Sequence, residues 1–179
     1  FTVRTLERLG VSAVVIGDKC DQSNKFHSTA NVKQLKDSVR EFCYKISAGK
    51  DAQVSSDFMI IARCDSLVLG KGMDDAVNRC KAYLKAGADG IMINSNGADG
   101  KEIFDFCELY KNFGTGKPLV VIPSHFDHIK EAEFETAGVN IVIYANHMLL
   151  AALPAMFEAA KKILINERCY DVRPQCSSI

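Results

Sequence analysis

The chain has 179 residues, of which 47% are apolar and 25% are charged, a composition typical of a globular protein with one substantial core. Lysine and arginine together number 22, as do aspartate and glutamate, so no charge excess favours nucleic acid or an anionic membrane surface as a partner. No apolar run is long enough to span a bilayer, and no signal-peptide pattern opens the chain. We therefore expect one domain over residues 1–179, with no membrane and no nucleic acid as a partner.

Seven cysteines are dispersed along the chain, at positions 20, 43, 64, 80, 107, 169 and 176, and none forms a C-x-x-C pair. Most of them lie inside apolar periodic segments. This distribution favours reduced, buried thiols over disulfides or a zinc site, and it predicts an intracellular, cytoplasmic protein.

The start of the chain is unusual. Residues 2–10, TVRTLERLG, are typical of a helix that has no cap before it. Because the first residue is also Phe1 rather than Met, we expect this chain to be the later part of a longer polypeptide.

Five short apolar segments at regular intervals predict β-strands. Three of them follow a helix that ends at a glycine, within residues 6–17, 84–94 and 135–145, since glycine readily takes the left-handed conformation at a helix end. The other two lie within residues 57–64 and 117–124. Their apolar runs are nearly continuous, as expected for parallel strands that are covered on both faces.

Amphipathic helices are predicted between the strands. The first, over residues 31–48, has apolar residues at spacings of three and four: Val32, Leu35, Val39, Phe42, Cys43 and Ile46. The second, over residues 73–86, repeats the spacing and has acidic residues near its start. Further helices are expected over residues 100–113, 129–137 and 147–166. The resulting order βαβαβαβαβα predicts an α/β fold with a parallel sheet.

Two architectures fit five such units. A flavodoxin-like open sheet fits if the chain is complete, and a (β/α)8 TIM barrel that lacks roughly its first three βα units fits if it is not. The uncapped start and the regularity of the repeat favour the barrel. No G-x-G-x-x-G or P-loop pattern follows any strand, which weakens the nucleotide-binding alternatives.

Polar residues stand at the carboxyl end of every predicted strand, where both architectures place their functional sites. These ends are Gly17-Asp18-Lys19, Arg63-Cys64-Asp65-Ser66, Asn94-Ser95-Asn96, Pro123-Ser124-His125 and Tyr144-Ala145-Asn146-His147.

Arg63 is the most specific of these residues, because it directly follows the apolar run MIIA. A guanidinium at the end of a buried strand is suited to a bidentate anion such as a carboxylate or a phosphoryl group. An internal ion pair with Asp65 or Asp18 is the alternative. Asp18 and Lys19 could bind metal and substrate, and a structural ion pair explains them equally well.

The positions of the histidines in the sequence favour structural roles over catalytic ones. His147 precedes a predicted helix and is expected to cap it or to pack, while His125 and His128 lie in a predicted loop and are expected to be solvated. No Ser/His/Asp order and no H-E-x-x-H pattern occurs, so a hydrolytic triad or a zincin has little support.

Four segments together resemble phosphoenolpyruvate mutase, a family of the isocitrate lyase superfamily of (β/α)8 barrels. They are KISAGKDAQ (45–53), DFMIIARCDSLVLGKGMDDAVNRCKAYLKAGADGIMINS (57–95), PLVVIPS (118–124) and YANHMLLAALPAM (144–156). The resemblance covers essentially the whole chain, and its AGKDAQ and ANH pieces are specific to the mutase branch. It implies about three further strands before Phe1.

The resemblance implies an enzyme that interconverts phosphoenolpyruvate and phosphonopyruvate with Mg2+, or closely related lyase or hydrolase chemistry on a 2-oxo acid. In such an enzyme Mg2+ and backbone amides hold the pyruvyl part, while an Arg, a His and an Asn stabilise the phosphoryl group. A loose, metaphosphate-like transition state needs positioning and positive charge more than a base. The resemblance also implies a homo-oligomer, a dimer or a tetramer, because the last helices are commonly exchanged between subunits in this superfamily.

Individual site residues follow from the resemblance. Arg63 matches the phosphoryl-binding Arg of the family, and Asn24 falls near its lid Asn once a one-residue deletion is allowed. Asp18 and Lys19 match the latter part of an EDK triplet. The substrate-binding residues implied are therefore Arg63, Asn24, Lys19 and Ser95, and Asp18 is a weak candidate for a metal ligand.

Two positions depart from the family pattern. Gly17 stands where the family has the Glu that organises the water shell of the metal. Asn94 stands where the family has a His, and its amide can donate a hydrogen bond to an oxyanion but carries no charge. The principal Mg2+ ligands are expected upstream of Phe1. A second hypothesis is therefore a catalytically impaired paralogue, or a fragment, that acts in assembly or small-molecule binding.

Overall fold

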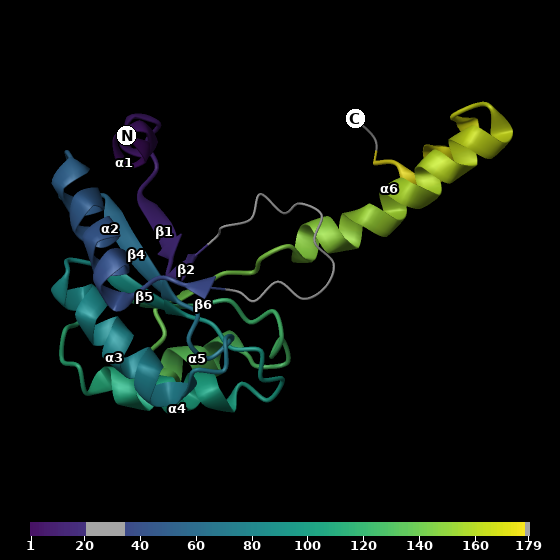
Figure 1. Cartoon of the computed structure of the whole chain (residues 1–179). Helices are drawn as coiled ribbons and strands as arrows, with labels where there is room; N and C mark the ends of the chain where they lie inside the picture. Colours follow the sequence, from purple (N-terminus) through teal and green to yellow (C-terminus); the bar gives the residue numbers. More distant parts are fainter. Residues whose placement is uncertain (21–34, 178–179) are drawn as a thin grey trace. The chain divides into compact units, whose positions relative to one another are not determined.

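A computed structural model of the chain describes residues 1–20 and 35–177 (Figure 1). The chain divides into two compact units, Phe1–Ile143 and Tyr144–Ile179. The single domain expected over residues 1–179 stays a prediction. Among the described residues, no helix combines the length and the hydropathy that crossing a membrane requires.

The first unit contains a five-stranded parallel sheet. Its strands are β1 (Ala13–Gly17), β4 (Met59–Cys64), β5 (Gly90–Ile93), β6 (Leu119–Val121) and β7 (Ile141–Val142). They lie in the order β1-β4-β5-β6-β7, and all four pairings are parallel. The predicted α/β fold with a parallel sheet is confirmed. Within this sheet the strands lie side by side in the order in which they follow along the chain. This order contradicts a flavodoxin-like sheet, since that sheet reverses its strand order at a switch point.

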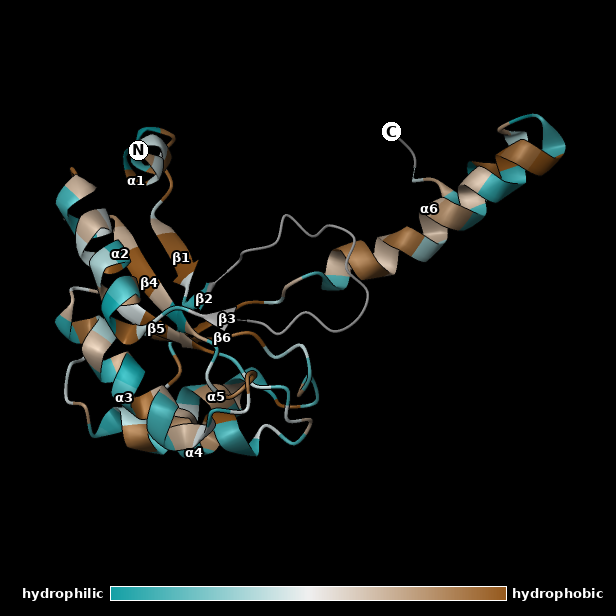
Figure 2. Ribbon diagram, in the orientation of Figure 1, coloured by the Kyte–Doolittle hydropathy of each residue, from teal (hydrophilic) through white to brown (hydrophobic). Residues whose placement is uncertain are grey.

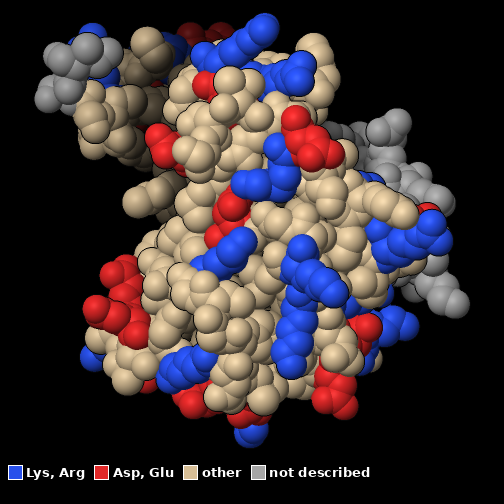
Figure 3. Space-filling view, turned by 90° about the vertical axis from the view of Figure 1, so that its left-hand side faces the viewer, with Lys and Arg blue, Asp and Glu red and all other residues tan. Residues whose placement is uncertain are grey.

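Helices connect these strands and cover one face of the sheet. They are α2 (Val39–Ala52), α3 (Gly72–Lys85), α4 (Lys101–Lys111) and α5 (Glu131–Ala137), and α1 (Thr2–Arg8) precedes β1. In Figure 2 the strands β1 and β4 are largely hydrophobic, whereas hydrophilic and hydrophobic residues alternate along α2, α3 and α4. On the face shown in Figure 3, acidic and basic side chains are both spread over the surface, in keeping with their equal totals of 22.

The start of α2 corrects the sequence prediction. The apolar spacing predicts a helix over 31–48, but Leu35–Lys36 form β3, which pairs antiparallel with β2 (Lys19–Cys20). Ser38 ends this extended segment with a capping box, because its Oγ accepts a hydrogen bond from the Glu41 N–H while the Glu41 carboxylate accepts one from the Ser38 N–H. Residues 31–34 lie outside the described residues.

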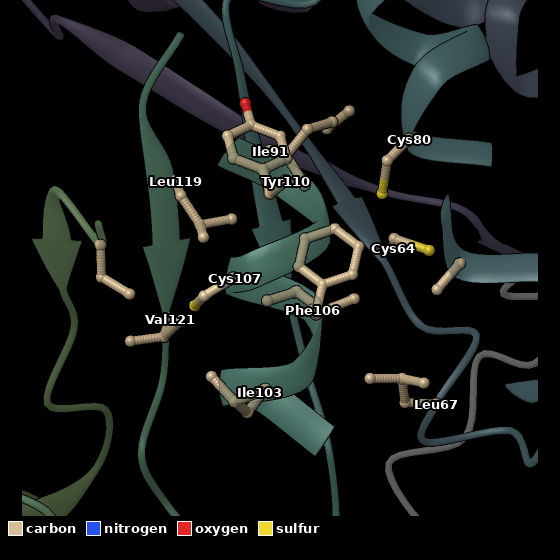
Figure 4. Packing of buried hydrophobic residues seen from close by; sticks show 14 of the residues in the cluster. Cys64, Leu67, Cys80, Ile91, Ile103, Phe106, Cys107, Tyr110, Leu119 and Val121 are labelled. Carbon is tan, nitrogen blue, oxygen red and sulfur yellow. The ribbon is translucent and has the colours of Figure 1, made fainter. Parts of the chain in front are cut away.

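The main hydrophobic core lies between the helices and the sheet. Figure 4 shows its centre, where side chains of α4 face side chains of the strands. The α4 residues are Ile103, Phe106, Cys107 and Tyr110, and the strand residues include Ile91, Leu119 and Val121. Figure 4 also shows the sulfur atoms of Cys64 and Cys80 on the side of this core nearest β4 and α3.

A smaller apolar cluster occupies the other face of the sheet and consists of Ile61, Met92 and Val120. Successive residues of a strand point to opposite faces, so residues two apart share a face. Arg63 therefore lies on the same face as Ile61, and Asn94 follows Met92 in the same way. Both predicted site residues extend this second face at the carboxyl end of the strands.

The second unit consists of α6 (His147–Asn166) and the 3-10 helix η1 (Tyr170–Gln175), which pack against each other. None of the residues of α6 is buried. Its large exposed apolar residues are Met148, Leu149, Leu150, Leu153, Met156, Phe157, Ile163, Leu164 and Ile165. Val172 of η1 is buried.

Candidate active site

Gly17 and Arg63 face each other at the carboxyl ends of two neighbouring strands. They are paired in the register of β1 and β4. A Cβ atom built on Gly17 would lie 2.6 Å from Nη2 and 3.0 Å from Cζ of Arg63. The guanidinium therefore occupies the space that a side chain at position 17 would need.

Asp65 holds the guanidinium in this place. Its Oδ2 atom accepts a hydrogen bond from Arg63 Nε at 3.2 Å and lies 3.1 Å from Nη2. Its Oδ1 atom accepts a hydrogen bond from Asn94 Nδ2 at 3.1 Å. The Asp65 side chain is 5% exposed and that of Arg63 is 35% exposed. The internal ion pair that the sequence left open is thus present, and one carboxylate joins Arg63 to Asn94.

Asp18 is fully buried at the same edge of the sheet. Its Oδ1 atom accepts the main-chain N–H of Asp65 at 3.0 Å, and its Oδ2 atom accepts the Tyr83 hydroxyl at 2.6 Å. Arg79 Nη1 lies 3.7 Å from the same Oδ2 atom. A buried carboxylate is stable only when it is paired and hydrogen-bonded, and these three donors meet that need from within the protein.

Arg79 and Tyr83 of α3 complete this buried network. Arg79 Nε bonds both carboxylate oxygens of Asp75 at 3.1 and 3.2 Å, and its Nη1 donates to the Asp37 carbonyl and the Tyr83 hydroxyl. Burial raises the pKa of Tyr83, and its hydrogen bond to Asp18 raises it further. Burial lowers the pKa of Arg79, but bonds to Tyr83 and Asp75 outweigh this, so the pKa lies above its ordinary value. The pair therefore stays a neutral phenol beside a charged guanidinium.

The thiol of Cys64, next to Arg63 in the chain, points to the helix side of the sheet. It lies 3.1 Å from the Ser66 hydroxyl, which in turn donates to Asp75 Oδ2 at 2.8 Å. A hydrogen bond with Cys80 lowers the pKa of the Cys64 thiol, and burial opposes that change. Both cysteines are free and buried.

The other predicted site residues take different places. The Ser95 hydroxyl is buried, donates to Glu102 Oε2 and accepts the Gly97 N–H at 2.9 Å, so it organises the loop after β5. Lys19 is half-buried in β2. Asn24 lies outside the described residues. The structure thus joins Arg63 and Asn94 through Asp65, and the ligand roles of all these residues stay predictions.

The histidines are placed as expected from the sequence. His125 and His128 are exposed. His147 begins α6, and its ring meets the ring of Tyr144 edge-on with 6.0 Å between centroids. Packing is therefore the role that the structure gives His147.

Sequence reasoning missed the part that α3 plays behind the site. Asp75, Arg79 and Tyr83 follow one another at intervals of four residues, which places them along one side of a helix. The apolar spacing indicates Tyr83 only as a core residue. The four-residue spacing of an acid, a base and a phenol would have indicated a polar network on this side.

The acidic residues at this edge do not form a set of Mg2+ ligands. Mg2+ requires a near-octahedral shell of oxygen atoms, which carboxylates and water usually supply. Both oxygens of Asp18 and both of Asp65 already accept hydrogen bonds from protein donors. Nowhere in residues 1–20 and 35–177 do three or more His, Cys, Asp or Glu residues gather in a way that could hold a metal ion. The described residues therefore do not fit this cofactor by themselves.

Comparison with known proteins places this chain in a family. The family described as phosphoenolpyruvate phosphomutase matches residues 1–164. The phosphoenolpyruvate phosphomutase of Tetrahymena pyriformis is 31% identical over 177 residues, which cover 99% of this chain and 58% of that protein. Phosphonopyruvate hydrolase, 2,3-dimethylmalate lyase and 2-methylisocitrate lyase are also relatives.

Solved structures agree. The phosphoenolpyruvate phosphomutase of Streptomyces platensis subsp. rosaceus superposes with a TM-score of 0.85 at 36% identity, covering 98% of this chain and 60% of that one. A phosphonopyruvate hydrolase in complex with oxalate and Mg2+ gives a TM-score of 0.82 at 33% identity, covering 99% and 59%. This chain thus spans less than two thirds of the length of these relatives. The chain belongs to the phosphoenolpyruvate phosphomutase family.

Proposed function

We propose that this chain acts in an enzyme of the phosphoenolpyruvate mutase type, which works on a small phosphonate or 2-oxo acid. The observation that carries the proposal is the joining of Arg63 and Asn94 on Asp65 at the carboxyl edge of a parallel sheet. This edge is where α/β folds bind their ligands. The consecutive strand order further supports a (β/α)8 barrel of the isocitrate lyase type as the full architecture.

The proposed reaction moves a phosphoryl group between the enolate oxygen and the methylene carbon of pyruvate, so that one P–O bond breaks as one P–C bond forms. Transfer to water instead gives the hydrolase reaction. In either case negative charge is spread over the phosphoryl oxygens in the transition state. The Arg63 guanidinium supplies positive charge to these oxygens and the Asn94 amide donates a hydrogen bond, while Asn24 and Lys19 stay proposed substrate contacts.

Mg2+ enters this proposal through relatives only. A solved phosphonopyruvate hydrolase holds oxalate and Mg2+. In this chain Asp18, the proposed weak ligand, has both oxygens bonded within the protein. The chemistry assigned here to Arg63 and Asn94 is therefore charge stabilisation by the protein itself.

The proposal extends to assembly and location. We infer a homo-oligomer, a dimer or a tetramer, because α6 carries a long series of apolar side chains and buries none of them. A second copy of the chain is the partner proposed for this surface. Cys43, Cys64, Cys80, Cys107, Cys169 and Cys176 are free thiols, which supports a cytoplasmic location.

The test uses the full-length protein. Phosphorus NMR with phosphonopyruvate and Mg2+ is expected to show turnover, and Arg63→Ala is expected to abolish it. Arg40→Ala removes an arginine that contacts Tyr44 on the exposed side of α2 and serves as the matched control. Absence of turnover in the wild-type protein would contradict the enzyme. Light scattering of the same protein tests the oligomer, and a monomer would contradict that part.

A second candidate is a catalytically impaired paralogue that binds a small oxyanion and does not turn it over. The observation that favours it is the environment of Gly17, where a guanidinium fills the space of a side chain. Among the described residues, no three His, Cys, Asp or Glu residues gather in a way that could hold a metal. Calorimetry distinguishes the two candidates. Binding of oxalate without turnover and without measurable Mg2+ binding supports the impaired paralogue, whereas tight Mg2+ binding by the full-length protein contradicts it.

A further inference from the structure

The position of the Arg63 guanidinium is set by Gly17 on one side. A methyl group on Gly17 would lie 2.6 Å from Nη2, closer than real Cβ atoms approach other heavy atoms. The atoms that it would meet are the far end of a flexible side chain. Gly17 is also not among the glycines with a positive φ, so alanine suits its backbone. An alanine at position 17 would therefore move the guanidinium and leave the strand in place.

On its other side the guanidinium is set by Asp65, which is itself held firmly. The Asp65 N–H donates to Asp18 Oδ1 at 3.0 Å, and its carboxylate is almost fully buried. The two carboxylate oxygens serve different partners, Oδ2 for Arg63 and Oδ1 for Asn94. Two donor side chains from neighbouring strands are thus tied to one fixed group.

Donor groups remain on both side chains. A guanidinium has five N–H bonds and an amide has two. Asp65 accepts hydrogen bonds from Arg63 Nε and from Asn94 Nδ2, and it forms an ion pair with Arg63 Nη2. In the described ranges 1–20 and 35–177, no residue accepts a hydrogen bond from Arg63 Nη1. Because both side chains bond to one carboxylate, their remaining donors lie near each other and can meet one oxyanion together.

We propose that Gly17 and Asp65 are positioning residues, which fix Arg63 beside Asn94 for one oxyanion of the ligand. The inference rests on the proposed function, since the oxyanion is the phosphonate or the carboxylate group of the substrate. Gly17 supplies the space and Asp65 supplies the anchor. The arrangement makes the donor edge ready before the ligand arrives, which lowers the entropy lost on binding.

The substitution Asp65→Asn distinguishes an effect of the Asp65 charge on anion binding from an effect of Asp65 on the position of the donor groups. If Asp65 acted only through its charge, its removal would relieve repulsion and tighten anion binding. Under the positioning proposal, asparagine presents an NH2 group toward donors that need an acceptor, and binding weakens. Calorimetry of the full-length protein with inorganic phosphate and with oxalate, in separate titrations, measures the effect and shows which kind of oxyanion uses the edge.

We expect Gly17→Ala and Asp65→Asn each to lower the affinity of the protein for phosphate or for oxalate by about ten- to a hundredfold. The matched controls are Gly49 in α2 and Asp89, which precedes β5. Gly49→Ala places a methyl group 2.7 Å from Ile60 Cδ1, and Asp89→Asn breaks an ion pair with Lys50. Both controls are expected to leave the affinity for phosphate and oxalate unchanged.

A double-mutant cycle completes the test. In an Arg63→Ala background, Gly17→Ala is expected to have no further effect on affinity, because its effect passes through the guanidinium. Additive losses, unchanged binding in both single variants, or tighter binding by Asp65→Asn would overturn the inference. Phosphorus NMR of turnover is measured separately. If the Gly17 and Asp65 variants bind the probes more weakly but the wild-type protein shows no turnover, the inference is retained and the enzyme is contradicted. If the wild-type protein shows turnover but the variants bind the probes as it does, the enzyme is retained and the inference is overturned. A wild-type protein that binds neither probe also overturns the inference.

Discussion

The Tyr83 hydroxyl donates a 2.6 Å hydrogen bond to Asp18 Oδ2, and both side chains are completely buried. The phenol belongs to α3 and the carboxylate follows β1, so this bond ties a helix to the edge of the sheet that carries Arg63. The Tyr83 ring packs edge-on against Phe42 of α2, with 4.6 Å between centroids. The Tyr83 side chain thus connects α3 and α2 to Asp18, beneath the edge of the sheet that carries Arg63.

Tyr83→Phe is expected to lower the free energy of unfolding by about 1–3 kcal/mol, because it leaves a buried carboxylate oxygen with one donor fewer. The ring and its contact with Phe42 are kept, so the loss reports the hydroxyl alone. Urea unfolding followed by circular dichroism measures it. Tyr44→Phe, which removes an exposed hydroxyl, is the control and is expected to cause little change. Equal stability of the two variants would contradict the role given to Tyr83.

The raised pKa of Tyr110 predicts that the free energy of unfolding falls at alkaline pH. Burial raises its pKa from 10.0 to about 12, and its hydroxyl donates to the Lys117 carbonyl at 3.1 Å. A raised pKa in the folded state means that the contribution is complete below pH 10 and is lost as the pH rises toward 12. Cys107, whose pKa burial raises to about 11, adds a loss that begins near its ordinary value of 9.0.

Tyr110→Phe tests this dependence. The variant is expected to be less stable than the wild type near pH 8, because the hydrogen bond to Lys117 is absent, and the gap is expected to narrow between pH 10 and 12. Cys107 and Tyr83 still titrate in the variant, so its stability also falls, but less steeply. Urea midpoints at several pH values measure both curves. Curves that stay parallel up to pH 12 would contradict the assignment to Tyr110.

Ser38→Ala is expected to destabilise the first unit by about 1 kcal/mol, the usual effect of removing an N-cap side chain. The Ser38 hydroxyl accepts the Glu41 N–H, and alanine leaves that donor without its partner. Ser177→Ala removes an exposed hydroxyl near the end of the described residues and is the control. Thermal unfolding of both variants measures the difference, and an unchanged midpoint for Ser38→Ala would argue against a capping box that stabilises α2.

Most of the fold could be predicted because the local patterns and the tertiary structure agree. Nearly continuous apolar runs and helix-ending glycines indicate the order of strands and helices. The start of α2 was missed because Leu35 and Val39 continue the helical spacing on both sides of the cap at Ser38. The spacing of apolar residues describes which side is buried, and it does not show where the backbone changes direction.

The sequence predicts the location of the candidate site, but it does not predict the hydrogen bonds between the site residues. Arg63 and Asn94 could be placed at the strand ends because parallel strands end at one edge. The sequence could not show that Asp65 joins them, since the direction of a side chain after a strand depends on its neighbours. Nor could it show that Arg63 fills the space above Gly17, because that contact depends on the register of β1 and β4.

The burial of the cysteine side chains predicts the order in which they react with an alkylating reagent. Burial is expected to affect the rate of reaction more than the pKa of the thiol does. Cys169 and Cys176 are exposed, whereas Cys64, Cys80 and Cys107 are buried. The hydrogen bond with Cys80 lowers the pKa of Cys64, but alkylation needs both a thiolate and access to it. Treatment of the native full-length protein with iodoacetamide, followed by peptide mass spectrometry, is expected to label Cys169 and Cys176 first and the three buried thiols only after unfolding in urea. Labelling of Cys64 as fast as Cys176 would show that the edge of the sheet beside Arg63 opens to solvent far more often than its buried hydrogen bonds allow.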